Sequence, residues 1–423
     1  MNEFDNVESY NKSPNVRNRV NATIEEIHQG ISQDEHLRNK SNLSLLTGES
    51  GIALFYSHLY IYTQDEQYHQ IVFSLLKNIY QQIDAQGIRS LNFGYGFTGI
   101  GWLVHHLKNL NLLQRSEILD FNKLDKQIAF AMLEQGKIGY LDYFSGALGY
   151  TLFFIQELNK SRIRYLEKLV IEISKRKINI LNSYAWLEFN PAVGTQSTTT
   201  VNLGIAHGMP SILSVLLQLY RKGIMPHLCE EMIIGGINFF LETGIFDDPE
   251  KGSIFPSAFN IHEQNEKLSR QSRLAWCYGD LSILHLLIEI DNTFKLPAVK
   301  SVIAKMIIFE CKRTNLEKNL VVDSGLCHGA AGVLHLFRRI KQKLSCDSKW
   351  LIPQLDLTIA YWTDLTLTKF KDNTGKYLTL DSTKNGYTTT YGLLEGMSGV
   401  GLVLLSMLLD TEKLKWDKVL LLE

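Results

Sequence analysis

Two kinds of apolar segment alternate along the chain. In the first kind, apolar residues follow one another almost without interruption behind a glycine, as in Ile52–Tyr60 behind Gly48. In the second kind, apolar residues recur at helical spacing among polar ones, as in Gln70–Ile83. A helix that is apolar all round is buried on every side, whereas an apolar stripe covers one side of a core. The pattern therefore predicts a buried inner helix for each glycine-led run and an amphipathic outer helix in front of it.

The glycine-led run occurs seven times. Its first glycine stands at positions 48, 96, 146, 208, 279, 329 and 396, so successive copies are 48 to 71 residues apart. In the fourth and fifth copies, Ser211 and Ser282 replace the second glycine. Helix pairs that repeat along a chain either stack into an open solenoid or close into a ring. The strong apolarity of the inner helices favours the closed ring.

The glycines stand where each inner helix is expected to begin. Glycine there lets neighbouring turns approach closely near the axis, and the first backbone N–H groups of a helix have no partner within the helix. All seven helix starts would point to the same end of the ring. We therefore expect a shared cavity at that end.

The ring accounts for most of the chain. Residues 1–40 are polar and charged, and we expect them to form an N-terminal arm or a first outer helix. Residues 41–423 are expected to form the ring as a single domain. The stretches 186–202, 247–266 and 384–391 are rich in polar residues, glycine or proline and are expected to be surface loops.

Composition narrows the possible functions. The 43 basic and 44 acidic residues give a formal net charge of −1, which argues against a nucleic-acid-binding surface. No apolar run reaches the roughly 18 to 20 residues of a membrane span. Five cysteines, without a recognisable secretion signal, favour reduced thiols in a cytoplasmic protein over a disulfide framework.

Candidate metal ligands stand directly in front of two inner helices. Cys327 and His328 precede Gly329, and Cys277 lies two residues before Gly279. A lone cysteine is usually an inert, buried one, but two thiolates and an imidazole form a set suited to Zn²⁺ with its fourth position open for chemistry. A helix N-terminus also lowers the pKa of a thiol, which favours the thiolate that a metal binds.

Other reactive side chains share this lead-in position. Asp142 stands before Gly146, His207 before Gly208, and Arg273 before Cys277. Each alone has an ordinary structural explanation, such as a satisfied histidine or a solvated charge. Four consecutive units that place reactive groups at one end of one ring instead indicate an active site.

Together these motifs resemble the lanthionine synthetase C (LanC) family of lanthipeptide cyclases. The resemblance rests on Trp276–Gly279, Cys327–Gly329, Ala206–Gly208 and the seven glycine elements, and it extends from about residue 40 to the C-terminal end. It implies an all-α fold, an α/α toroid with inner and outer layers of seven helices.

The resemblance also implies roles for individual residues. One Zn²⁺ per chain would be bound by Cys277, Cys327 and His328. Acid, base and electrostatic roles fall on His207, Asp142, Arg273 and Tyr278. The implied reaction adds a peptide Cys thiol to dehydroalanine or dehydrobutyrine and forms the (methyl)lanthionine ring of a lanthipeptide antibiotic. The implied partners are a dehydrated precursor peptide with its leader, a lanthipeptide dehydratase and an exporter.

Three other functions fit parts of the pattern. Thiol addition of glutathione to dehydroamino acids in proteins would use the same metal and acid. A non-catalytic zinc scaffold for a modification complex would need the metal alone, so the reactive residues beside the ligands argue against it. A glycosidase on the same fold would require paired carboxylates, and the lead-in positions offer only Asp142 clearly.

Overall fold

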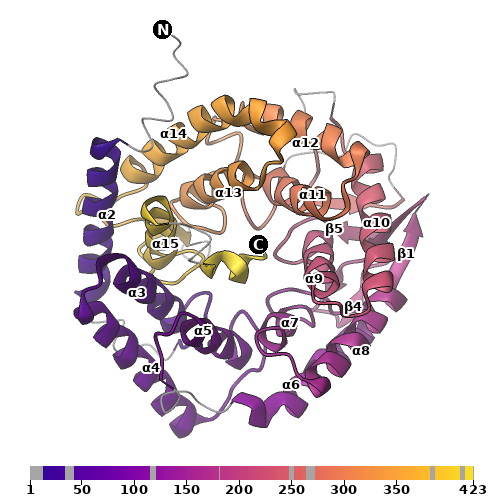
Figure 1. The fold of residues 1–423 in the computed structure, drawn as a ribbon, viewed down its shortest axis with the longest axis horizontal. Coiled ribbons are helices and arrows are strands. Elements are labelled where there is room, and N and C mark those ends of the chain that lie inside the picture. Colours follow the sequence, from indigo (N-terminus) through magenta and orange to yellow (C-terminus); the bar gives the residue numbers. More distant parts are fainter. Residues whose placement is uncertain are drawn as a thin grey trace.

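The computed structural model describes residues 13–33, 42–114, 121–180, 182–246, 252–262, 272–381, 386–409 and 415–422. Nearly half of the expected N-terminal arm, residues 1–12 and 34–40, lies outside these ranges, and so do residues 247–251 and 263–266 of the 247–266 stretch. The described residues contain fourteen α-helices arranged in two concentric layers around one axis (Figure 1). The predicted α/α toroid is confirmed.

The outer layer consists of α2 (Pro14–Ser32), α4 (Glu66–Gln86), α6 (Asp125–Ile138), α8 (Lys160–Arg176), α10 (Pro226–Thr243), α12 (Pro297–Glu310) and α14 (Ile352–Thr368). The inner layer consists of α3 (Glu49–Thr63), α5 (Phe97–Asn109), α7 (Gly149–Phe154), α9 (Met209–Arg221), α11 (Asp280–Phe294), α13 (Ala330–Lys343) and α15 (Met397–Leu408). Each outer helix precedes an inner helix in the chain, as the apolar pattern predicts. Helix α2 takes the place of the first outer helix.

The two layers differ in burial as the pattern requires. Helix α15 is buried from Met397 to Ser406 on all of its sides. Helix α8 buries only a stripe that includes Leu166, Leu169 and Ile173, and the side chain of Asn159 caps its first turn by accepting hydrogen bonds from two backbone N–H groups. The core therefore lies between the layers and along the axis.

The glycines at the inner-helix starts leave room for close backbone contacts within each turn. A Cβ atom at Gly399 would lie 1.9 Å from the carbonyl oxygen of Leu393, six residues earlier in the same turn. Gly279 also has a φ of +129°, a conformation that other residues rarely adopt. In the fifth unit, Ser282 donates a hydrogen bond to the carbonyl oxygen of Trp276 instead. The serine thus satisfies a group that glycine leaves open.

Backbone hydrogen bonds join the turns in front of the inner helices around the axis. They connect Leu46 N to Gly94 O, Gly94 N to Phe144 O, Ala206 N to Cys277 O, Cys277 N to Cys327 O, Cys327 N to Leu394 O and Leu394 N to Leu46 O. Among the described backbone groups, none bridges the third and fourth turns. Helix α7 of the third unit is also short and ends at Phe154, although the apolar run continues to Leu158. The ring is therefore least continuous between α7 and α9.

Short β-strands lie in the connections between the helices. Four antiparallel pairs occur in the described residues: β1 (Lys177–Ile180) with β2 (Ser183–Trp186), β3 (Phe189–Asn190) with β4 (Thr195–Gln196), β5 (Thr200–Asn202) with β6 (Ala258–Asn260), and β7 (Thr379–Asp381) with β8 (Gly386–Thr388). Stretches expected to be loops thus contain paired backbone. The β5–β6 pair joins two insertions that lie on opposite sides of α9 and α10 in the chain.

The axis of the ring is filled by the C-terminal segment Trp416–Leu422, whose first part is the 3-10 helix η6 (Trp416–Leu420) (Figure 1). The indole of Trp276 donates to the carbonyl oxygen of Leu420 at 2.9 Å, and the hydroxyl of Tyr143 donates to that of Val419 at 2.6 Å. Both aromatic residues belong to turns in front of inner helices. The C-terminal segment therefore supports those turns from inside the ring.

We expect Asp417→Ala to destabilise the protein strongly. The buried carboxylate of Asp417 lies 3.0 Å from both Arg339 Nε and His335 Nε2 in the axis. Removing one partner of a buried ion pair costs about 3–5 kcal/mol, because the other charge is left unpaired. Thermal unfolding should show a clearly lower Tm. Asp347→Ala, which removes an exposed pair with Lys300, is the control and should leave Tm unchanged, and equal effects of both changes would contradict the axial role.

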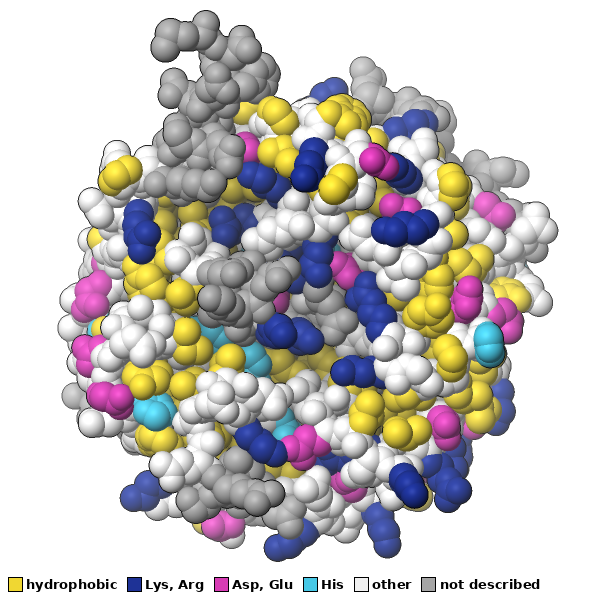
Figure 2. All heavy atoms as spheres, viewed as in Figure 1, with side chains coloured by type: hydrophobic (Ala, Val, Ile, Leu, Met, Phe, Trp, Pro, Cys, Tyr) yellow, Lys and Arg dark blue, Asp and Glu magenta, His cyan; other side chains and the backbone are white. Residues whose placement is uncertain are grey.

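The surface agrees with the near-neutral composition. Positive and negative side chains are interspersed over the face seen in Figure 2. No helix in the described ranges is both long enough and apolar enough to span a bilayer.

Candidate active site and metal centre

Two neighbouring turns bring the predicted metal ligands together. One ligand atom each from Cys277, Cys327 and His328 lies within 4.8 Å of the other two. Cys277 precedes α11 and the other two residues precede α13. The backbone bond from Cys277 N to Cys327 O, 3.2 Å long, holds the two turns against each other.

The imidazole of His328 is oriented by a buried carboxylate. Asp323 Oδ2 lies 3.1 Å from Nε2 of His328, and Asp323 itself accepts hydrogen bonds from the backbone N–H groups of Gly325 and Leu380. A metal-binding histidine usually donates its second ring N–H to such a carboxylate. Nδ1 is therefore the ring nitrogen that remains for a metal.

The electrostatics of this group favour a cation. A hydrogen bond from Cys327 holds the pKa of the Cys277 thiol well below its usual range, and His328 and Arg273 contribute in the same direction. Burial alone would lower the pKa of His328, but the hydrogen bonds to Asp323 and Cys277 raise it to about 10. A thiolate and a carboxylate thus stabilise positive charge between them. The three residues fit a divalent metal that prefers thiolate and imidazole ligands.

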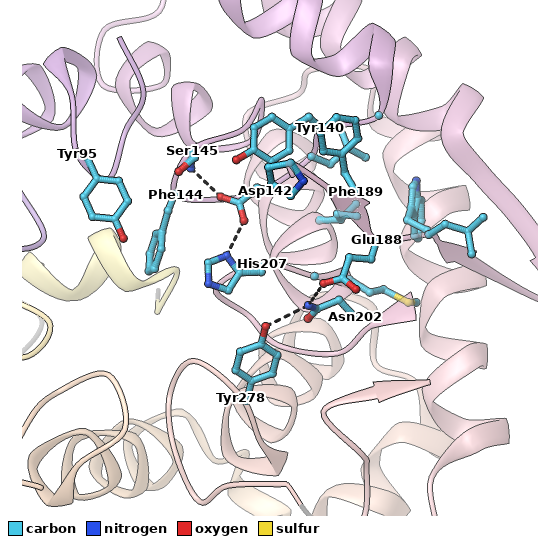
Figure 3. A pocket seen from close by; sticks show the side chains of 18 residues that line it. Tyr95, Tyr140, Asp142, Phe144, Ser145, Glu188, Phe189, Asn202, His207 and Tyr278 are labelled. Atoms are coloured by element: carbon cyan, nitrogen blue, oxygen red, sulfur yellow. Dashed lines mark hydrogen bonds and ion pairs between the residues drawn. The ribbon is translucent and has the colours of Figure 1, made fainter. Parts of the chain in front are cut away.

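A histidine–carboxylate pair faces the same end of the ring (Figure 3). Nδ1 of His207 lies 2.5 Å from Oδ2 of Asp142, whose other oxygen accepts a hydrogen bond from the backbone N–H of Ser145. Burial lowers the pKa of His207, but the hydrogen bond and the charge of Asp142 outweigh it and raise the pKa above its ordinary value. This pair also bridges the joint between the third and fourth units.

The metal group and the histidine pair border two adjacent cavities that share lining residues. A cavity of about 400 Å³ is lined by Arg273, Cys277, Cys327 and other residues, and a second of about 330 Å³ extends past Asp142 toward β3. His207 and Tyr278 line both cavities. The structure therefore places Asp142, His207, Arg273, Tyr278 and the two candidate cysteine ligands around these adjacent cavities, and His328 completes the metal group beside them.

Comparison with known proteins identifies the family of this chain. The family model described as lanthionine synthetase C-like protein matches residues 39–421. The chain belongs to this family. Its structure is also similar to that of nisin cyclase, with a TM-score of 0.72 and 20% sequence identity over 94% of this chain and 96% of that chain.

Within this lanthionine synthetase C-like protein, the start of α11 is fixed by a buried ionic network. Asp280 accepts hydrogen bonds from the backbone of Ile254 and Phe255 and lies 3.0 Å from Arg313 Nη1. Arg313 also donates to the carbonyl oxygen of Ser272, directly before Arg273. Charges beneath the turn thus hold the segment that carries Arg273, Cys277 and Tyr278.

Several residues of the cavity were not among the candidates. Thr47, Tyr95 and Glu395 line the 400 Å³ cavity, and each directly precedes the first glycine of its unit, as His207 and His328 do in theirs. The same offset, applied to all seven units, predicts them.

Asp323 and Asn202 each stand six residues before the first glycine of their unit, an offset that could have found them. Glu188 lacks such a signal, because it reaches the site from the 186–202 insertion.

The remaining cysteines lie away from the cavity. Burial raises the pKa of Cys229 to about 12 and that of Cys311 to about 11, and Cys346 is exposed on the outer surface. We expect the combined change Cys229→Ala, Cys311→Ala and Cys346→Ser to leave the formation of thioether rings in a peptide substrate intact. Lost activity in a variant that keeps its fold and its metal would contradict this prediction.

Proposed function

We propose that the protein is a zinc-dependent lanthionine synthetase, a cyclase that adds Cys thiols of a peptide to dehydroalanine or dehydrobutyrine in the same peptide. The observation that carries the proposal is that a Cys–Cys–His metal group and a raised-pKa histidine open into the same cavity. Family membership and the similarity to nisin cyclase support it.

The reaction needs a thiolate near neutral pH and a proton for the carbanion formed on addition. Zn²⁺ bound by Cys277, Cys327 and His328 would lower the pKa of a substrate thiol in the open position. Asp323 would keep His328 in the orientation and tautomer that bind the metal. We propose one such ion per chain.

The proton would come from His207. When the C–S bond forms, the electron pair of the C=C bond moves toward the adjacent carbonyl and leaves an enolate, which takes a proton at the α-carbon. Asp142 holds Nδ1 of His207, so Nε2 is the nitrogen that delivers this proton. The guanidinium of Arg273 would stabilise the negative charge that develops on the carbonyl oxygen.

The proposed substrate also implies partners. It is a precursor peptide with a leader, in which a lanthipeptide dehydratase has already converted Ser or Thr, and an exporter would remove the finished product. The reduced state of the five cysteines is compatible with a cytoplasmic location.

The test is direct. The purified zinc-loaded protein is incubated with a dehydrated Cys-containing peptide, remaining thiols are alkylated over time, and the products are counted by mass spectrometry. Loss of alkylation without mass gain from an added thiol supports the cyclase. Addition of glutathione as the sole product would favour the glutathione-transfer alternative, and no product of either kind would favour the zinc scaffold.

We expect Asp142→Asn to shift the pH dependence of the reaction. His207 acts as an acid only while it is protonated, so kcat falls as the pH rises through the pKa of His207. Asp142 raises that pKa against burial, with smaller contributions from the nearby Cys277 and Glu188. Without the charge of Asp142, the alkaline fall of kcat should move to lower pH. Asp347→Asn, at the surface, is the control and should leave the pH profile unchanged. If Asp142→Asn also leaves the alkaline fall of kcat at the same pH, His207 is not the acid whose pKa Asp142 raises.

A further inference from the structure

The side chain of Asn202, at the end of β5, lies between Glu188 and Tyr278 at the edge of the active site (Figure 3). Its Oδ1 accepts a hydrogen bond from the backbone N–H of Gly204 at 2.9 Å. Its Nδ2 donates to Glu188 Oε1 at 2.8 Å and to Tyr278 Oη at 3.1 Å. The amide is almost completely buried, at 3% exposure, so these contacts fix its orientation.

The donor and acceptor groups available determine the direction of each of these hydrogen bonds. A backbone N–H can only donate, so the atom of Asn202 that faces Gly204 is the carbonyl oxygen. Nδ2 therefore faces Tyr278 and Glu188, and its two hydrogens are both used. The nitrogen of an amide accepts no hydrogen bond, so Oη of Tyr278 must be the acceptor. The single hydrogen of the phenol is left to point elsewhere.

The Tyr278 ring lines both cavities, so this hydrogen is available to a group bound there. A Cβ atom at Gly204 would lie 2.6 Å from two ring carbons of Tyr278, so the backbone of Gly204 packs closely against the ring. The centroid of the ring lies 6.1 Å from that of His207. The hydroxyl is thus held at the edge of the space that contains the proton donor and the metal group.

We propose that Asn202 and Glu188 are positioning residues that fix the Tyr278 hydroxyl as a hydrogen-bond donor to the carbonyl oxygen of the dehydroamino acid. This inference rests on the proposed cyclase function. The proton stays on Tyr278 throughout: the hydroxyl stabilises the negative charge that the oxygen gains when the C–S bond forms, and the α-carbon receives its proton from His207. A fixed donor aimed at a developing oxyanion acts without reorganisation during the reaction.

Asn202→Asp tests the direction of the bond. The carboxylate has the same shape and still accepts from Gly204, but its second oxygen can only accept, so the Tyr278 hydroxyl turns toward it and away from the substrate. We expect kcat to fall by about 10²-fold, the loss typical of one oxyanion donor, with peptide Kd and zinc content unchanged. An unchanged kcat would overturn the proposal.

The double variant separates positioning from general damage. If Asn202 acts only through Tyr278, the Asn202→Asp/Tyr278→Phe protein is no slower than Tyr278→Phe alone. Additive losses would overturn the proposal. Should Asn202→Asp fail to fold, Asn202→Ser, which removes the amide donor without adding charge, is subjected to the same cycle.

Two further variants control for charge. Asn202→Asp/Glu188→Gln removes the repulsion between the new carboxylate and Glu188 and should remain slow, whereas recovery of the wild-type kcat would show that repulsion caused the loss. Asn190→Asp makes the same chemical change at the exposed end of β3 and should keep the wild-type rate. A wild-type protein that forms no ring would refute the cyclase function itself, which is a different outcome.

Discussion

Replacing Cys327 by Ala is expected to remove the bound zinc and to abolish the formation of thioether rings in the peptide substrate. The remaining ligands, Cys277 and His328, form only half of a tetrahedral site, and a catalytic zinc site normally needs three protein ligands. The thiol of Cys327 also lowers the pKa of the Cys277 thiol by its hydrogen bond, so the second ligand would lose part of its thiolate character. Elemental analysis should show a fall from about one zinc per chain to nearly none.

The control for this change is Cys311→Ala. Cys311 is also a buried cysteine, but it lies at the end of the outer helix α12 and lines neither cavity. That variant should keep its zinc and its activity. Full zinc retention in folded Cys327→Ala protein would refute the ligand assignment, and the far-ultraviolet circular dichroism of both variants shows whether the fold survives.

The second large effect is expected for His207→Asn. Asparagine can still donate a hydrogen bond to Asp142 and nearly fills the space of the ring, but it cannot deliver a proton near neutral pH. Loss of a general acid slows a reaction by roughly 10²- to 10⁴-fold. Because His207 leads α9 and is not a metal ligand, zinc content and peptide binding should remain at wild-type values.

Time courses of thiol alkylation and mass spectrometry measure this loss. His227→Asn, on the exposed side of α10, is the matched control and should react at the wild-type rate. A zinc-loaded His207→Asn protein with wild-type rates would exclude His207 as the proton donor. Tyr278 or a metal-bound water would then have to supply the proton.

Much of the fold was predictable because its signal is local and repeated. The glycine in front of each inner helix reflects contacts within one turn, such as Gly399 against the carbonyl of Leu393. Seven copies of such a turn indicate seven equivalent helix starts, and their common end of the ring locates the cavity. The positions of Cys277, His207 and Cys327 relative to these glycines were therefore enough to group them in one site.

Other features depend on contacts between distant segments. The early end of α7, the strands of the 177–202 insertion and the β5–β6 pair have no counterpart in the repeat. The sequence also gives no sign that Trp416–Leu422 fills the axis, because the segment is short and its partners, among them Trp276, lie far away in the chain.

The sequence by itself determined the layers of the ring, the end that carries the cavity and the group of reactive residues directly before the inner helices. Those properties follow from helical periodicity and from steric contacts within single turns, which neighbouring residues decide. The tertiary structure alone decided how side chains from different turns are oriented on one another: Asp142 on His207, and Asn202 on Tyr278. Hydrogen-bond direction depends on atoms placed within about 3 Å by separate parts of the chain, and only the closed ring brings those parts together.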